Sequence, residues 1–299
     1  MANDPFMAGD KVVSITPRRD EAMKPAELIQ ITGHHELTLN ARRAITVLWH
    51  NAHAQGIEQG RDYQIETDRL KPLDHKGNEM VEEAIEALMR TLILLRLPEG
   101  GTRRVQFLGG NDLDDPDRAG GVFTYSFDKR LVEVLQDSTI WGKLSIPVLM
   151  AFTSKYAVSL YENIAKMTNL SHKTTQEYSL EEFRDLLGVQ PGKYKSFGEL
   201  NKHVIKPVVS EINALASFNI TLAPRKTGRR VTHVSVGWWT KTEIEQNAAW
   251  QELKRHKSGR RARIGGHAEY VSEVQPSAIK MVRNDPFLKA RRGASPKTS

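Results

Sequence analysis

The sequence predicts an α+β, helix-rich protein made of two tandem, related domains. The order helix, helix, helix, two-stranded hairpin occurs twice, at an offset of about 115 residues. The expected helices carry apolar residues at steps of three and four, and the segments after them alternate apolar and polar residues. Three such helices packed on one another, with a hairpin over the remaining edge of their core, form a winged-helix domain. We therefore expect two tandem winged-helix domains related by internal duplication.

Composition restricts the partners that this chain can have. Its 299 residues are 39% hydrophobic and 26% charged, which is typical of a soluble globular protein. It has no run of about 18 apolar residues and no signal-peptide pattern at its N-terminus, so we expect a cytoplasmic protein without a membrane partner. The absence of cysteine excludes disulfides and thiolate chemistry. A net charge of +7 favours a polyanionic partner.

Each half is expected to contain the same elements in the same order. In the first half they are a helix at 37–52, a segment at 63–65, a helix at 78–95 and a strand at 104–108. In the second half they are a helix at 152–167, a capped helix at 179–187, a helix at 197–215, a strand at 218–222, a hairpin that ends at Trp238 and Trp239, and a further helix at 241–257. The expected boundaries are a disordered tail at 1–25, domains at 26–145 and 146–257, and a basic flexible tail at 258–299.

The helix expected at 197–215 has a defined start and one buried side. Ser196 followed by Glu199 is a capping-box pattern, so the helix should begin at about Phe197. Pro207 should bend it near Val204 without ending it, because the apolar spacing continues beyond the proline. The positions that share its buried side are Phe197, Leu200, Val204, Val208, Ile212 and Leu215.

The two halves differ in charge, and this difference predicts their roles. The first-half helix carries four glutamates against Lys76 and Arg90, a net charge of −2, so phosphates would repel it. The second half has a basic helix face and a basic hairpin whose turn is expected at Thr227–Gly228. A helix-turn-helix with a basic wing is typical of a helix that enters the DNA major groove. The candidate DNA-binding residues are Lys193, Tyr194, Lys195, Ser196, Asn201, Lys202, His203, Lys206, Arg225, Lys226, Arg229 and Arg230.

Within this set the side chains suit different contacts. Asn201 can bind adenine through two hydrogen bonds, and Lys202 or Lys206 can reach guanine or phosphate. The wing arginines suit phosphates or the minor groove.

No catalytic, cofactor or metal site is predicted. The sequence lacks a phosphate-binding loop, a nucleophile elbow and the H-E-x-x-H pattern. His34-His35-Glu36 lacks the i, i+4 spacing of such metal ligands. The acidic run Asp112–Asp117 does not fit a calcium loop and is expected to be a solvated loop at the tip of the first hairpin.

Two stretches resemble iteron-binding plasmid replication initiators. Tyr156–Glu162 is similar to the tyrosine-bearing helix of that family, and 197–213 shares its spacing and its mid-helix proline at Pro207. The resemblance runs from about Leu37 to Trp239. It implies two winged-helix domains, the first for dimerisation with auxiliary DNA contacts and the second for reading the iterons. Asn201 and His203 stand where that family usually has a lysine and an arginine, which leaves the base preference open.

The resemblance also implies a set of partners. They are the direct repeats of an origin in double-stranded DNA, a homodimer in equilibrium with the monomer, and the host initiator ATPase and replicative helicase. Monomers would open the origin, and dimers would repress the initiator's own promoter or pair origins. Two alternatives remain: a winged-helix transcriptional regulator that binds an inverted repeat, and an enzyme that processes nucleic acid.

Overall fold

The computed structural model describes residues 20–31, 34–71, 78–96, 100–114, 121–136, 138–168 and 174–264. It separates into two compact units, Met1–Lys257 and Ser258–Ser299. All the sheets and both hydrophobic cores described below belong to the first unit. No helix in the described ranges is long and apolar enough to span a membrane.

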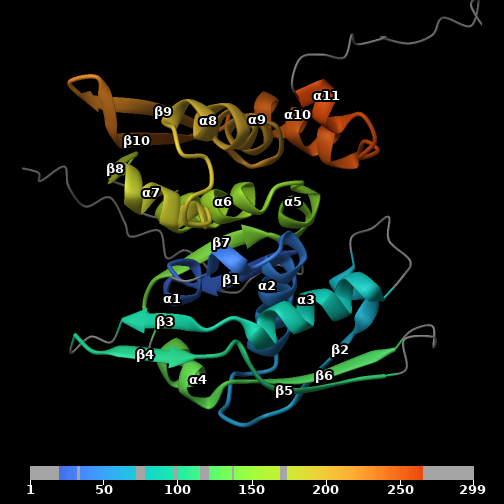
Figure 1. Ribbon diagram of the computed structural model, residues 1–299. Helices are drawn as coiled ribbons and strands as arrows, with labels where there is room; N and C mark the ends of the chain where they lie inside the picture. The colour runs from blue at the N-terminus through green and yellow to red at the C-terminus, as the bar shows by residue number, and fades with distance from the viewer. Residues whose placement is uncertain are drawn as a thin grey trace, which may run out of the picture. The chain divides into compact units, whose positions relative to one another are not determined.

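The second half of the first unit is a winged helix (Figure 1). Its helices are α6 (Lys155–Thr168), α7 (Leu180–Leu187), and a long helix made of α8 (Phe197–Leu200), the π-helical turn η3 (Asn201–Ile205) and α9 (Lys206–Leu215). Its sheet has the strand order β8 (Thr175–Ser179), β10 (Arg230–Thr240) and β9 (Phe218–Thr227), all antiparallel. Both the helix order and the hairpin agree with the sequence prediction.

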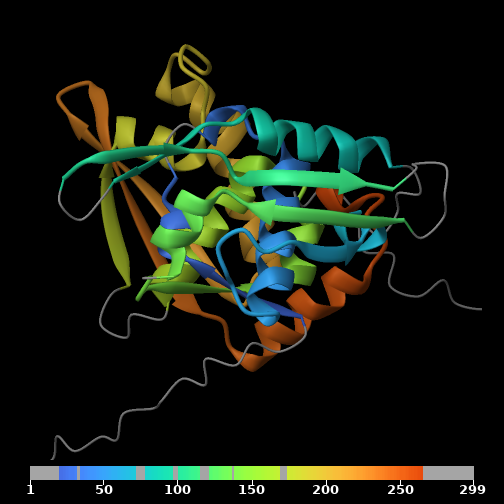
Figure 2. The same cartoon turned by 90° about the horizontal axis from the view of Figure 1, so that it is seen from below.

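The first half has the same sheet topology. Strand β2 (Tyr63–Glu66) pairs with β6 (Val122–Phe127), which pairs with β5 (Leu108–Leu113), so the order β2-β6-β5 repeats β8-β10-β9. Figure 2 shows β5 and β6 side by side. The helices α2 (Leu39–Ala54) and α3 (Glu79–Arg90) correspond to α6 and to the long helix of the second half. The tandem winged helices related by duplication are therefore present.

Three details of the first half differ from the prediction. The capped helix α7 has only the 3-10 helix η2 (Thr67–Leu70) as its counterpart. Helix α3 ends at Arg90 instead of residue 95, because Ile93–Arg96 forms strand β3. This strand pairs with β4 (Thr102–Val105) in an extra hairpin that has no equivalent in the second half, so β5 rather than the segment at 104–108 corresponds to β9.

A two-stranded sheet lies between the halves and shortens the expected N-terminal tail. Strand β1 (Glu21–Pro25) pairs with β7 (Trp141–Ser145), whereas the sequence placed all of residues 1–25 in a disordered tail. The short helices α1 (Ala26–Ile29) and α5 (Ile146–Ala151) follow directly after these strands. Gly142 allows close packing here, because a Cβ at this position would lie 2.7 Å from Cδ1 of Ile29. Residues 1–19 lie outside the described part.

Each half has its own hydrophobic core. The second core contains Phe183, Leu200 and Ile212, with relative exposures of 1% or less, and it extends to Ala22 and Leu144 of the β1–β7 sheet. The first core is built around Trp49, Phe123 and other residues between 28 and 135. Burial of these apolar faces is the main stabilising contribution to each half.

The helix expected at 241–257 is shorter in the structure. Helix α10 covers Glu243–Lys254 and is preceded by a capping box between Thr242 and Glu245. Its residues Ile244 and Trp250 are exposed. In the second unit, α11 covers Arg260–Ile264, within the stretch expected to be a flexible tail.

Candidate nucleic-acid interface

The predicted helix-turn-helix has both of its caps in place. The Ser179 hydroxyl accepts a hydrogen bond from the Glu182 backbone at the start of α7, and the Ser196 hydroxyl accepts one from the Glu199 backbone at the start of α8. In each case the glutamate carboxylate accepts the backbone N–H of the serine. Gly188 ends α7 in the left-handed conformation at φ 70°.

Pro207 is accommodated by a π-helical turn. A proline inside an α-helix removes a backbone donor and crowds the preceding turn. Here η3 lies directly before Pro207, and the N–H of Lys206 donates to the carbonyl of Asn201, five residues earlier. The helix continues through α9 as predicted, and its buried side runs from Leu200 to Leu215 with exposures of 0–1%, whereas Phe197 is half-buried.

The opposite side of this long helix is exposed and basic. Lys202 and His203 are exposed, and Lys206 is exposed about one turn after them, while Asn201 is half-buried. Lys193 and Lys195 are exposed in the turn before α8. The structure thus brings the predicted helix and turn residues onto one surface. We call this surface, with the hairpin cations discussed next, the basic reading face.

The wing is the β9–β10 hairpin. Its turn is formed by Gly228 and Arg229, one residue later than expected, since Thr227 pairs with Arg230. Gly228 has φ 62°, a conformation that glycine adopts at little cost. Arg225, Lys226, Arg229 and Arg230 are all exposed. Figures 1 and 2 both place this hairpin beside α8 and the turn before it.

One wing residue already has an acidic partner. The Arg225 guanidinium lies 2.8 Å from the Glu177 carboxylate on β8, and both side chains are largely exposed. An exposed ion pair of this kind contributes about 0–1 kcal/mol, so a phosphate can replace Glu177 as the partner of Arg225 at little cost. A bulge between Val231 and His233 interrupts the pairing of β10 with β9, and at the end of β10 Trp238 is buried whereas Trp239 is exposed.

Sequence reasoning missed the contacts that hold the turn before α8. Arg184 of α7 donates from Nη1 to the Tyr194 carbonyl at 3.0 Å and from Nη2 to the Lys193 carbonyl. The Tyr194 ring stacks on the His203 imidazole at 6.1 Å between centroids and meets Tyr156 of α6 edge-on at 6.5 Å. Burial and the neighbouring Tyr194 raise the pKa of Tyr156 to about 12.

The corresponding surface of the first half is acidic, as predicted. Glu79, Glu83 and Glu86 are exposed on α3, and Arg90 forms an ion pair with Glu86 at 2.6 Å. Lys76 and residues 115–117 of the acidic run lie outside the described part. Asp112 is exposed at the end of β5.

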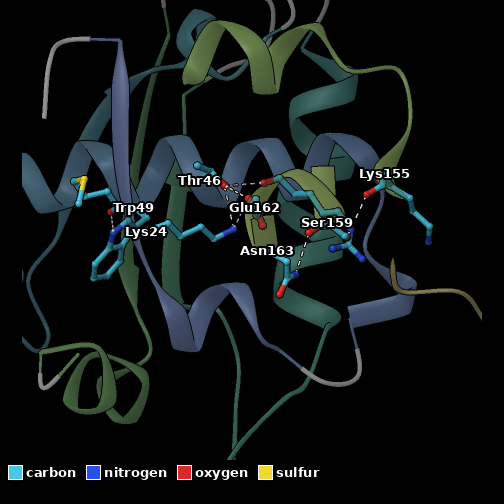
Figure 3. A network of polar contacts seen from close by, with 9 residues as sticks. Lys24, Thr46, Trp49, Lys155, Ser159, Glu162 and Asn163 are labelled. Carbon is cyan, nitrogen blue, oxygen red and sulfur yellow. Dashed lines mark hydrogen bonds and ion pairs between the residues drawn. The ribbon is translucent and has the colours of Figure 1, made fainter. Parts of the chain in front are cut away.

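A buried polar network joins the two halves (Figure 3). The Lys24 ammonium lies 2.7 Å from Oε1 of Glu162 on α6 and donates to the Thr46 hydroxyl on α2, and Thr46 donates to the same carboxylate at 3.0 Å. Burial lowers the pKa of Lys24, and the Glu162 carboxylate acts in the opposite direction. Nearby, Lys155 of α6 donates to the carbonyl of His35 at 2.6 Å.

The described residues contain no group of three or more acidic, histidine or cysteine side chains that could hold a metal ion. His35 is half-buried and belongs to the 3-10 helix η1 (His34–Glu36).

A comparison with known protein families finds a match in the second half. The family model described as "Initiator Rep protein, WH2" matches residues 179–238, which cover α7 through Trp238 of β10. A replication initiation protein of Escherichia coli is 32% identical over 105 residues, 34% of this chain and 32% of that protein. The match therefore spans about a third of the length of this curated relative.

The fold also resembles a solved structure. The crystal structure of Pi initiator protein in complex with iteron DNA matches with a TM-score of 0.59 and 17% identity, over 76% of this chain and 100% of that one. At this identity the match concerns the fold alone. Residues 179–238, which match the initiator Rep model, carry all twelve predicted contact positions.

Proposed function

We propose that this chain is a plasmid replication initiator that binds the direct repeats of an origin through the basic reading face. The observation that carries the proposal is the set of exposed cations on one helix face and one wing, within the domain that matches the initiator family. Such an arrangement supplies phosphate contacts from the turn and wing and base contacts from the helix.

The contact residues have distinct proposed roles. Lys202 and Lys206 bind guanine or phosphate, and Asn201 at the edge of the face binds adenine. Lys193, Lys195 and the wing cations hold the phosphate backbone or enter the minor groove. The Ser196 hydroxyl accepts a hydrogen bond from the Glu199 backbone N–H, so its own proton can be donated to a phosphate oxygen. Tyr194 and His203 act as a stacked pair.

The proposed function of the whole chain involves no catalysis. The first domain mediates self-association. It makes at most auxiliary DNA contacts, because the exposed glutamates of α3 repel phosphate. Monomers open the origin and recruit the host initiator ATPase and replicative helicase, and dimers repress the initiator's own promoter. These activities follow from the resemblance, and the charge difference between the halves supports only the assignment of DNA binding to the second half.

The test compares the wild type with the double variant Lys202→Ala/Arg229→Ala. The probe is a DNA duplex that contains tandem repeats of about 20 base pairs. Such repeats are expected in an origin that flanks the gene. We expect affinity to fall by about 2–5 kcal/mol and the log–log salt slope to fall by about 1.8, since each lost phosphate contact removes about 0.9. Circular dichroism should be unchanged, because both side chains are exposed.

The matched control is Glu83→Ala/Arg90→Ala, which removes exposed side chains from α3 and should leave the affinity unchanged. Unchanged affinity of the Lys202/Arg229 variant at moderate salt would remove the basic reading face from the site. A footprint over one inverted repeat, with no direct repeats, would favour a transcriptional regulator instead.

A further inference from the structure

The turn between α7 and α8 contains a backbone conformation that needs support. Tyr194 has φ 52°, and it is the one non-glycine residue with positive φ in the described part of the chain. A bulky side chain rarely adopts this left-handed conformation, so surrounding contacts must hold it. The strained residue lies two positions before Ser196, the N-cap of α8. Any change in the turn therefore alters where the helix begins and how its basic face is aimed.

Arg184 supplies contacts of the kind required. Its guanidinium donates to the carbonyls of Lys193 and Tyr194, the two carbonyls on either side of the strained residue's N–H and Cα. The backbone of Arg184 is itself fixed, because its carbonyl accepts the N–H groups of Gly188 and Val189 at the end of α7. A planar guanidinium presents its N–H donors in a rigid fork, whereas the three donors of an ammonium rotate on a flexible stem and fix two acceptors less firmly.

We propose that Arg184 is a positioning residue for DNA recognition: it fixes the turn at 193–194 and thereby the orientation of the basic face of α8, η3 and α9. The inference rests on the proposed DNA-binding function and adds a residue that is not itself a predicted DNA contact. The aromatic contacts of Tyr194 also stabilise the turn, because Tyr156 connects it to α6 and His203 connects it to the basic reading face. Arg184 thus affects base recognition indirectly, by fixing the backbone that orients the contact residues.

The test measures the affinity of Arg184→Ala for the tandem-repeat duplex and for a scrambled duplex of the same length and composition, each over a series of salt concentrations. We expect affinity for the repeats to fall at least tenfold, affinity for the scrambled duplex to change less than twofold, and the salt slope to stay the same. Arg184→Lys keeps the charge and should recover less than half of the lost specificity, because it lacks the planar fork.

Other outcomes overturn the inference in distinguishable ways. A salt slope lower by about 0.9, with equal losses on both duplexes, would make Arg184 a direct phosphate contact. A lower melting temperature with equal losses on both duplexes would make its role only structural. If Arg184→Ala does not fold, Arg184→Lys decides, and full specificity in that variant would refute the proposal.

The proposed function is tested separately by the Lys202/Arg229 variant. If that variant loses affinity while both Arg184 variants keep theirs, DNA binding stands and the positioning role fails. If all of these variants bind like the wild type, the basic reading face itself is wrong.

Discussion

Glu162→Gln should destabilise the protein more than any exposed substitution, because it leaves buried cations without their counter-charge. Glu162 is 4% exposed, and Lys24 and Arg42 beside it are 3% and 6% exposed. Burial lowers the pKa of Arg42 to about 10 even with the Glu162 carboxylate opposing that shift. Removing one partner of a buried ion pair costs about 3–5 kcal/mol, and we expect a loss of this size in the free energy of unfolding.

The measurement is urea unfolding followed by circular dichroism and by tryptophan fluorescence, since Trp49 donates to the carbonyl of Met23 beside the network. Thr46→Val is the matched control. It removes the hydrogen bond that Thr46 donates to the same carboxylate and the one that it accepts from Lys24, but no charge, so it should cost about 1 kcal/mol. A loss below about 1 kcal/mol for Glu162→Gln would refute the reasoning, because the two cations would then need no counter-charge.

Two further predictions concern stability. Leu200→Ala should lower the free energy of unfolding by about 2–5 kcal/mol through a core cavity, so a circular dichroism melt should separate its indirect loss of DNA binding from the direct loss in the Lys202 variant. Lys155 has its pKa lowered to about 8, first by burial and then by Arg42 and Lys193. Between about pH 8 and 10.5 the unfolded chain holds a proton that the folded chain has released, so wild-type stability should rise with pH relative to Lys155→Met. Parallel unfolding curves of the two proteins across this range would contradict the assignment.

Local signals in the sequence predicted the long helices and the hairpin of the second half, but not strand β8. The capping boxes at Ser179 and Ser196 set where α7 and α8 begin, because a cap depends on residues within one turn. The apolar spacing determined which side of the long helix is buried, and the remaining side is where the cations lie. The continuation of the helix past Pro207 also followed from this spacing, although the π-helical turn that permits it did not.

The first half was less predictable because its differences depend on pairing between distant segments. Leu94 and Leu95 continue the apolar pattern of α3, yet Ile93–Arg96 pairs with Thr102–Val105 and forms a strand. Glu21–Pro25 resembled a tail by composition, but it becomes a strand because residues 141–145 provide a partner edge. Tertiary context overrides local preference at such positions.

The sequence by itself determined the duplicated helix order, the caps and the sign of the charge on each half, since these depend on residue type and short-range spacing. Only the tertiary structure decided which residues from different elements meet. Arg184 reaches the carbonyls of 193 and 194 because α7 and the turn fold against each other, and Lys24 meets Glu162 across 138 positions. Side-chain partners at such separations are set by packing of the whole domain, which no local pattern encodes.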